Sequence, residues 1–233
     1  MTYSLALADP AHSSWSMRIG LLVQRFALPA SLEFGDLYTP DFPRLMAGFA
    51  PARTVPALKL PDGTVVCESL AIAEELASRF PDAGLWPADP SARALARGLA
   101  AEMHAGFGPL RQACPMNLRV AYRDVPVSEA VGADLTRLET IWTAARDRFA
   151  PLGPWLCGTY SIADAFYAPI AARIAGYSLP AGDVARAYVA AHLSDPAFVA
   201  WRDLGLRQGP HQAAYDLDYP QISWPGAEAI NPT

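Results

Sequence analysis

A cluster of hydroxyl side chains stands at the predicted start of the first helix. The segment 12–18 has the sequence HSSWSMR, and apolar residues then recur at positions 19, 22, 23 and 26, the spacing of one helix face. Ser13 and Ser14 therefore lie at the N-terminus of a helix. A hydroxyl donor at such a position stabilises an anion, and the helix dipole adds to the effect. The pattern favours a site that holds a bound acid in its ionised form.

A second group of chemically useful residues surrounds a predicted hairpin. Two apolar runs, at 54–60 and 65–67, flank the pair Asp62-Gly63, which favours a tight β turn. Val55-Pro56 precedes the first strand of the hairpin, where a proline is tolerated and a cis peptide bond has a low energetic cost. Glu68-Ser69 stands where the second strand gives way to a helix, so free N–H groups and a carboxylate meet there. Such an end suits a zwitterionic peptide.

These residues sit within an alternating pattern of strands and helices. Residues 3–8 form a short apolar run that Asp9-Pro10 ends, which predicts a buried strand. A second strand is predicted at 32–34, one or two helical turns at 42–46, and a helix at about 69–80 after the hairpin. The order β-α-β-α-β-β-α is the thioredoxin-like arrangement.

The rest of the chain is predicted to be helical. Three prolines and a glycine fall within 81–90, so we predict a linker there, with residues 1–83 as one domain and 84–233 as a second, all-α domain. Gly106, Gly108 and Pro109 should weaken the second half of the first helix. Ser161-x-x-Asp164 predicts a capping box with a structural role. The predicted helices are 91–113, 129–149 with Ser128 as its cap, one that opens at Ser161, 182–192 and 196–206. From residue 209 the tail is predicted to be a coil packed on the surface, or partly ordered.

The combination of these motifs resembles the glutathione transferase superfamily over about the first 205 residues. The resemblance implies a thioredoxin-like domain followed by an all-helical domain. It also implies that Val55, beside Pro56, pairs with the cysteinyl backbone of glutathione, while Glu68 and Ser69 take the γ-glutamyl amine and carboxylate. Glutathione would be a co-substrate, no metal is expected, and the resemblance implies a homodimer.

The serines resemble the motif of zeta-class enzymes, in which the first serine is assigned to the thiol. A cysteine-type thiol has a pKa of about 8.5, so it is mostly ionised at neutral pH only where the protein stabilises the thiolate. We carry that role onto Ser13, with Ser14 as the alternative; the competing interpretation is that one serine only caps the helix. Zeta-class and beta-class enzymes have cysteine where this chain has Trp15, so this position lacks the residue that cysteine-based thiol exchange requires. We expect His12 in a surface turn and Arg18 at the domain interface or structuring the site.

The acceptor substrate is expected near the first helix of the second domain. His104, Phe107, Gly108 and Arg111 would share one face of a continuous helix, which the resemblance partly points at the cleft. Core or dimer packing explains the same pattern equally well. The sequence does not specify the electrophile.

Composition limits the remaining possibilities. The chain has 233 residues, 52% of them hydrophobic and 18% charged, and a net charge of −5 without a basic cluster, which argues against nucleic acid as a partner. We find no membrane-spanning or secretory segment and expect a cytoplasmic protein. Cys67, Cys114 and Cys157 are scattered, so we interpret them as buried apolar residues that form neither a disulfide framework nor a metal site.

The sequence therefore predicts a two-domain glutathione transferase that activates the thiol through a serine and directs it at a small electrophile. Two alternatives stay open: a glutathione-dependent cis-trans isomerase, and a binding or scaffold protein that keeps the fold without catalysis. Intact Val55-Pro56 and Glu68-Ser69 argue against the scaffold, which has no need of a γ-glutamyl site.

Overall fold

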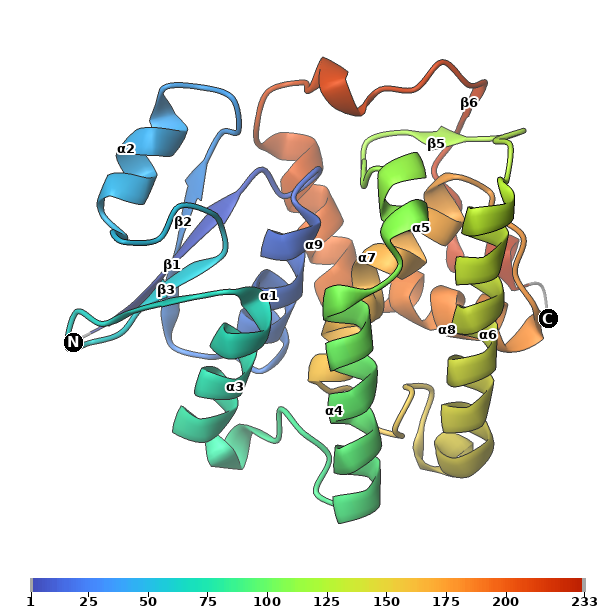
Figure 1. Ribbon diagram of the computed structural model, residues 1–233, viewed down its shortest axis with the longest axis horizontal. Helices are drawn as coiled ribbons and strands as arrows, with labels where there is room; N and C mark the ends of the chain where they lie inside the picture. The colour runs from blue at the N-terminus through green and yellow to red at the C-terminus, as the bar shows by residue number, and fades with distance from the viewer. Residues whose placement is uncertain (1, 232–233) are drawn as a thin grey trace.

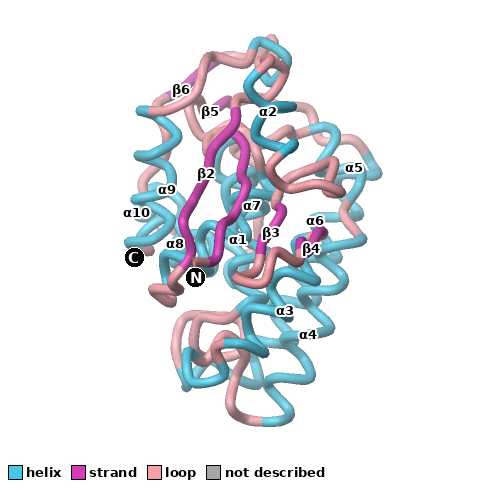
Figure 2. Tube along the Cα trace, turned by 90° about the vertical axis from the view of Figure 1, so that its left-hand side faces the viewer, coloured by secondary structure: helices cyan, strands magenta, loops and turns pink. Residues whose placement is uncertain are grey.

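The computed structural model describes residues 2–231 and begins with a four-stranded mixed sheet (Figure 1). The sheet has the order β2-β1-β3-β4, in which β1 and β2 are parallel and the other neighbours are antiparallel. Figure 2 shows α2 on the near side of this sheet and α1 and α3 behind it. The elements are β1 (Tyr3–Ala8), α1 (Ser14–Arg25), β2 (Ala30–Gly35), α2 (Asp41–Ala47), β3 (Ala57–Lys59), β4 (Val65–Cys67) and α3 (Ser69–Arg79). The predicted thioredoxin-like arrangement is confirmed.

Local chemistry explains the sheet. Four consecutive residues of β1, 5–8, are fully buried, as expected for a strand covered on both faces. The hairpin turns at Gly63, whose φ of 90° favours glycine, and the Thr64 N–H donates to Asp62 Oδ1 at 2.9 Å. The Val55-Pro56 bond is cis.

Helices make up most of the second half. The 3₁₀ turn η1 (Pro81–Ala83) separates α3 from them, beside the predicted domain boundary at residue 84, which stays a prediction. The helices are α4 (Pro90–Ala105), α5 (Gly108–Ala113), α6 (Glu129–Phe149), α7 (Ile162–Gly176), α8 (Asp183–Ser194), α9 (Pro196–Arg207) and the short α10 (Ala227–Ile230), with 3₁₀ turns η2 (Ala150–Leu152) and η3 (Ala213–Tyr215). Ser128 caps α6 as predicted, by accepting from the Val131 N–H at 3.3 Å.

Helix α7 lies at the centre of this half, against α1, α4 and α8. All of its residues are buried. The predicted capping box is confirmed: the Ser161 N–H donates to Asp164 Oδ2 at 2.9 Å. Asp164 Oδ1 also accepts from the Leu156 N–H at 3.1 Å and the Tyr188 hydroxyl at 2.9 Å. This network fixes the start of the helix that carries Arg173 to the cleft.

Two sequence predictions, the single helix 91–113 and the burial of Cys67, were wrong. The expected helix 91–113 is two helices, because Gly106 leaves α4 in an extended conformation and Phe107 adopts a φ of 59° before α5 begins. The region is helical as predicted, with one short strand pair added: β5 (Ala121–Tyr122) pairs with β6 (Gln221–Ile222) from the tail. Cys67 is only half-buried, whereas Cys114 and Cys157 are buried as expected.

Candidate functional site

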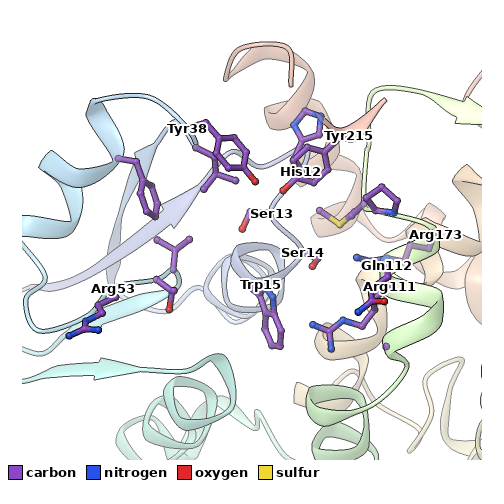
Figure 3. A pocket seen from close by; sticks show the side chains of 17 residues that line it. His12, Ser13, Ser14, Trp15, Tyr38, Arg53, Arg111, Gln112, Arg173 and Tyr215 are labelled. Atoms are coloured by element: carbon purple, nitrogen blue, oxygen red, sulfur yellow. The ribbon is translucent and has the colours of Figure 1, made fainter. Parts of the chain in front are cut away.

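Two adjoining cavities lie along the N-terminal end of α1. The larger has a volume of about 670 Å³ and the smaller about 240 Å³. Trp15, Thr54 and Val55 line both, so the cavities form one cleft between the sheet and the helical half. Figure 3 shows that the serines of α1, tyrosines and arginines line the larger cavity.

The two predicted serines differ in their hydrogen bonds. Ser13 is the N-cap of α1: its Oγ accepts from the Ser16 N–H at 3.3 Å, and its hydroxyl donates to Ser16 Oγ at 2.8 Å. The Ser14 hydroxyl lines the larger cavity and has no hydrogen-bond partner among residues 2–231. The N–H groups of Ser14 and Trp15 are also unpaired within that range, as expected in a first helical turn. Three donors therefore meet at one point.

The smaller cavity is closed at its far end by Glu68 and Ser69. Glu68 has a φ of 68°, a conformation that costs a non-glycine residue about 1–3 kcal/mol and is typical of functional sites. No side chain caps α3 at this residue, so the N-terminus of the helix is open to a ligand carboxylate. Val55 makes no backbone hydrogen bond to another described residue. The residues predicted to hold a peptide thus lie together, and the Val55 backbone and the N-terminus of α3 are free to bind a ligand.

Trp15 lines both cavities and stacks against two guanidinium groups. The Arg18 Cζ lies 4.2 Å from the centroid of its ring and the Arg111 Cζ lies 4.6 Å from it. Arg18 is buried, its Nε and Nη1 have no partner, and burial followed by the charge of Arg111 lowers its pKa to about 9. Such stacking compensates in part for the lost hydration of the cations.

A third guanidinium reaches the larger cavity from α7. Arg173 donates from Nε to the Cys114 carbonyl at 2.8 Å and from Nη1 to the Pro169 carbonyl at 3.0 Å. Burial, followed by the charge of Arg111, lowers its pKa to about 10. Within the described part of the chain, no carboxylate forms an ion pair with Arg18, Arg111 or Arg173. The positive charge of the cleft is therefore uncompensated.

The residues predicted for the acceptor site do not lie together. Arg111 lines the larger cavity, but Phe107 is buried against Tyr167, with ring centroids 6.3 Å apart. His104 lies behind the smaller cavity, with Nδ1 3.5 Å from Ser69 Oγ and Nε2 3.8 Å from Glu68 Oε2. Burial, then the charge of Arg18, lowers its pKa. The break between α4 and α5 explains the separation, because the shared helix face does not exist.

His12 is not the surface residue that the sequence suggested. It is buried, and its Nδ1 lies 2.8 Å from Asp9 Oδ2. The spacing Asp-x-x-His at a turn was the available signal for this pair. Arg173 and Tyr215 also line the larger cavity but were not among the predicted site residues.

Comparison with known proteins agrees with this geometry. Residues 12–79 match the N-terminal domain family of glutathione S-transferases. A glutathione transferase homolog from Burkholderia, crystallised with bound glutathione, has a TM-score of 0.64 and 23% identity over 88% of this chain and 98% of that one. The N-terminal part of the chain thus matches the glutathione S-transferase family, and the chain has the fold of solved glutathione transferases. Its transferase fold also resembles that of Omega 2S from Trametes versicolor, with a TM-score of 0.65 and 23% identity over 88% of this chain and 95% of that one.

Relatives at the sequence level are named maleylacetoacetate isomerase. The one from Pseudomonas aeruginosa is 34% identical over 111 residues, 46% of this chain and 50% of the relative. The one from Mus musculus is 35% identical over 103 residues, 42% of this chain and 45% of the relative. The chain thus spans about half the length of the curated relatives it matches.

Two further properties concern residues 2–231 alone. No helix in this range combines the length and hydropathy needed to cross a bilayer. The range also contains no group of three or more His, Cys, Asp or Glu side chains arranged to hold a metal ion.

Proposed function

We propose that this transferase-family protein is an enzyme that binds glutathione and activates its thiol at Ser14. The unpartnered Ser14 hydroxyl, beside two free N–H groups at the N-terminus of α1, carries this proposal. A thiolate placed there would accept up to three hydrogen bonds and face the positive end of the helix. Ser13, which resemblance favoured, already uses its hydroxyl to hold Ser16.

The tripeptide fits the cleft in one direction. Its γ-glutamyl carboxylate would accept hydrogen bonds from the open N-terminus of α3 and from Ser69, and its amine would pair with Glu68. The cysteinyl backbone would pair with Val55, which lines both cavities. This places the thiol at the junction beside Trp15 and directs it toward the larger cavity. Bound glutathione in the Burkholderia structure supports the binding of this tripeptide.

The acceptor would carry an anionic group. Arg111 and Arg173 line the larger cavity without a carboxylate partner, and a buried cation is costly unless it is paired. A carboxylate on the substrate would supply the missing charge. An electrophilic carbon held in this way would face the thiolate across the cavity.

Isomerisation is the second candidate reaction. The relatives from P. aeruginosa and mouse are named for maleylacetoacetate, an anion, and the guanidinium groups suit such a substrate. In that reaction the thiolate would add to a conjugated double bond and leave again after rotation. Glutathione would then be regenerated, whereas a transferase would consume it.

The test combines binding and turnover. We expect retention on glutathione-agarose, an ultraviolet thiolate band in the complex at neutral pH, and turnover of ethacrynic acid, a carboxylate-bearing enone. Arg111→Gln should raise KM for this enone about tenfold or more, because a charge-assisted hydrogen bond is worth about 1.5–3 kcal/mol. It should leave KM for neutral chlorodinitrobenzene unchanged.

Controls separate the possible outcomes. Arg202 also stacks on a tryptophan, with its Cζ 4.7 Å from the Trp224 ring, but does not line the cleft, so Arg202→Gln should leave both reactions unchanged. A folded protein with neither retention nor a thiolate band would contradict the glutathione role and favour a scaffold. We further propose a homodimer, to be tested by light scattering.

A further inference from the structure

The C-terminal tail contacts both sides of the cleft, since Gln212 contacts Leu37 just after β2 and β6 pairs with β5 of the helical half. Figure 1 shows it running from the end of α9 across the molecule to β6. Arg119 donates to the carbonyls of Gln208 at 2.7 Å and Gly209 at 3.1 Å, and the Leu217 N–H donates to the Tyr122 hydroxyl at 3.2 Å. The tail is therefore anchored on both sides of η3.

Tyr215 enters the larger cavity from this anchored segment. Its ring packs on that of His12, with centroids 4.8 Å apart, and both residues line the cavity with Ser13 and Ser14. Gln212 Nε2 donates to the Leu37 carbonyl at 3.4 Å, which ties the tail to the loop that carries Tyr38. Figure 3 shows the hydroxyl ends of Tyr38 and Tyr215 turned toward one another on the Ser13 side of the cavity.

The Tyr215 hydroxyl keeps its proton at neutral pH. Burial, followed by the hydrogen bond with Tyr38, raises the pKa of Tyr215 to about 12. The group is thus a hydrogen-bond donor that does not itself become a base. It lines the same cavity as the three donors that we assign to the thiol, but it comes from a different element.

We propose that Tyr215 is a catalytic residue of the acceptor site, where its hydroxyl donates a hydrogen bond to the carbonyl oxygen of a conjugated acceptor. This inference rests on the proposed function. When the thiolate adds to the β carbon, a C–S bond forms and the C=C π pair breaks. The electrons move to the carbonyl oxygen to give an enolate, which then takes a proton from solvent water at its α carbon. Tyr215 stabilises that developing negative charge without transferring a proton, as donors in an oxyanion hole do.

The experiment compares two electrophiles in Tyr215→Phe, which removes the hydroxyl and keeps the ring on His12. With ethacrynic acid, whose reaction develops charge on a carbonyl oxygen, we expect kcat/KM to fall about ten- to a hundredfold, the scale of one lost oxyanion donor. With chlorodinitrobenzene, which has no carbonyl, and in the ultraviolet titration of the bound thiol, we expect no change. Tyr38→Phe should lower enone turnover less, because it removes only the partner of Tyr215.

Tyr219→Phe is the matched control. Tyr219 belongs to the same tail but packs on Tyr122, with centroids 6.3 Å apart, and does not line the cavity. An equal fall in kcat/KM of Tyr215→Phe for both electrophiles, or no fall for the enone, would overturn the Tyr215 assignment. The proposed function would still stand if the thiolate band is present. If the wild-type complex shows no thiolate band, the proposed function and this inference fail together.

Discussion

Replacing Ser14 by alanine tests how the thiol is ionised. The substitution removes one hydroxyl at the first position of α1 and leaves the Ser13 cap and the backbone N–H groups in place. A hydrogen bond to a charged group contributes about 1.5–3 kcal/mol, which corresponds to about one to two pK units. The N–H groups and the helix dipole remain, and the dipole contributes about 0.3–1 kcal/mol, so the size of the shift measures the share of the hydroxyl.

The expected change in rate follows from the ionised fraction. If the wild-type site lowers the thiol pKa from about 8.5 to about 6.5, the variant should have a value of about 7.5–8.5. At pH 6.5 the thiolate fraction would then fall from one half to about 1–10%. Turnover should fall by about five- to fiftyfold at that pH and recover as the pH rises. Glutathione affinity should change little, because the rest of the tripeptide is proposed to bind through Val55, Glu68 and Ser69.

The assay is the ultraviolet absorbance of the bound thiolate against pH for the wild type and for two variants. Ser13→Ala is the informative partner, because Ser13 caps α1 and its loss should cost about 0.5–2 kcal/mol of stability. We expect it to lower the melting temperature with a smaller shift of the titration curve. A shift in Ser13→Ala alone would refute the assignment to Ser14. No shift in either variant would leave only backbone N–H groups to ionise the thiol.

Three other perturbations separate binding from folding. Ser69→Ala should weaken glutathione binding about tenfold in calorimetry, with an unchanged melting temperature, because Ser69 faces the smaller cavity; equal affinity would remove its γ-glutamyl role. Asp164→Ala should cost about 2–4 kcal/mol of unfolding free energy, since it leaves buried donors unpaired, yet preserve turnover per folded molecule. Burial lowers the pKa of His192 to about 3 in the folded state, so as the pH falls His192 is protonated in the unfolded chain before it is protonated in the folded one. The free energy of unfolding should therefore fall as the pH drops from about 6.5 toward 3. At pH 5 this loss is about 2 kcal/mol, and His192→Phe should not show it in denaturant titrations if burial is the cause.

The elements that local chemistry determines were predictable. The apolar run of β1, the Asp62-Gly63 turn and the capping box of Ser161 and Asp164 each depend on residues a few positions apart. The predicted helix 129–149 has the bounds observed for α6. The residues predicted to hold glutathione, Val55, Glu68 and Ser69, line one cavity, since the hairpin itself joins them.

The acceptor side depended on contacts that no local pattern encodes. Gln212 contacts Leu37 across 175 positions, so the entry of Tyr215 into the cleft has no signal in the aperiodic tail. The break after Gly106 did have a local signal, because Gly106 and Gly108 bracket Phe107. The direction of the side chains beyond the break, however, follows from the φ of Phe107, which only the structure gives. Patterns local in sequence thus predicted the residues of the proposed peptide site, whereas long-range packing determined which residues line the proposed acceptor site.

Trp15 shows how one departure from the family pattern changes the cleft. It occupies the position at which zeta-class and beta-class enzymes have cysteine, so this chain lacks the thiol that could form a mixed disulfide there. Its indole instead lies against Arg18 and Arg111 and lines both cavities. The ring packs on both guanidinium groups and lines the cleft in which the peptide and the acceptor are proposed to bind. Tryptophan at this position therefore excludes mixed-disulfide exchange through a protein cysteine. It also packs on two guanidinium groups that have no carboxylate partner, beside the cavity where the thiol of glutathione is proposed to react.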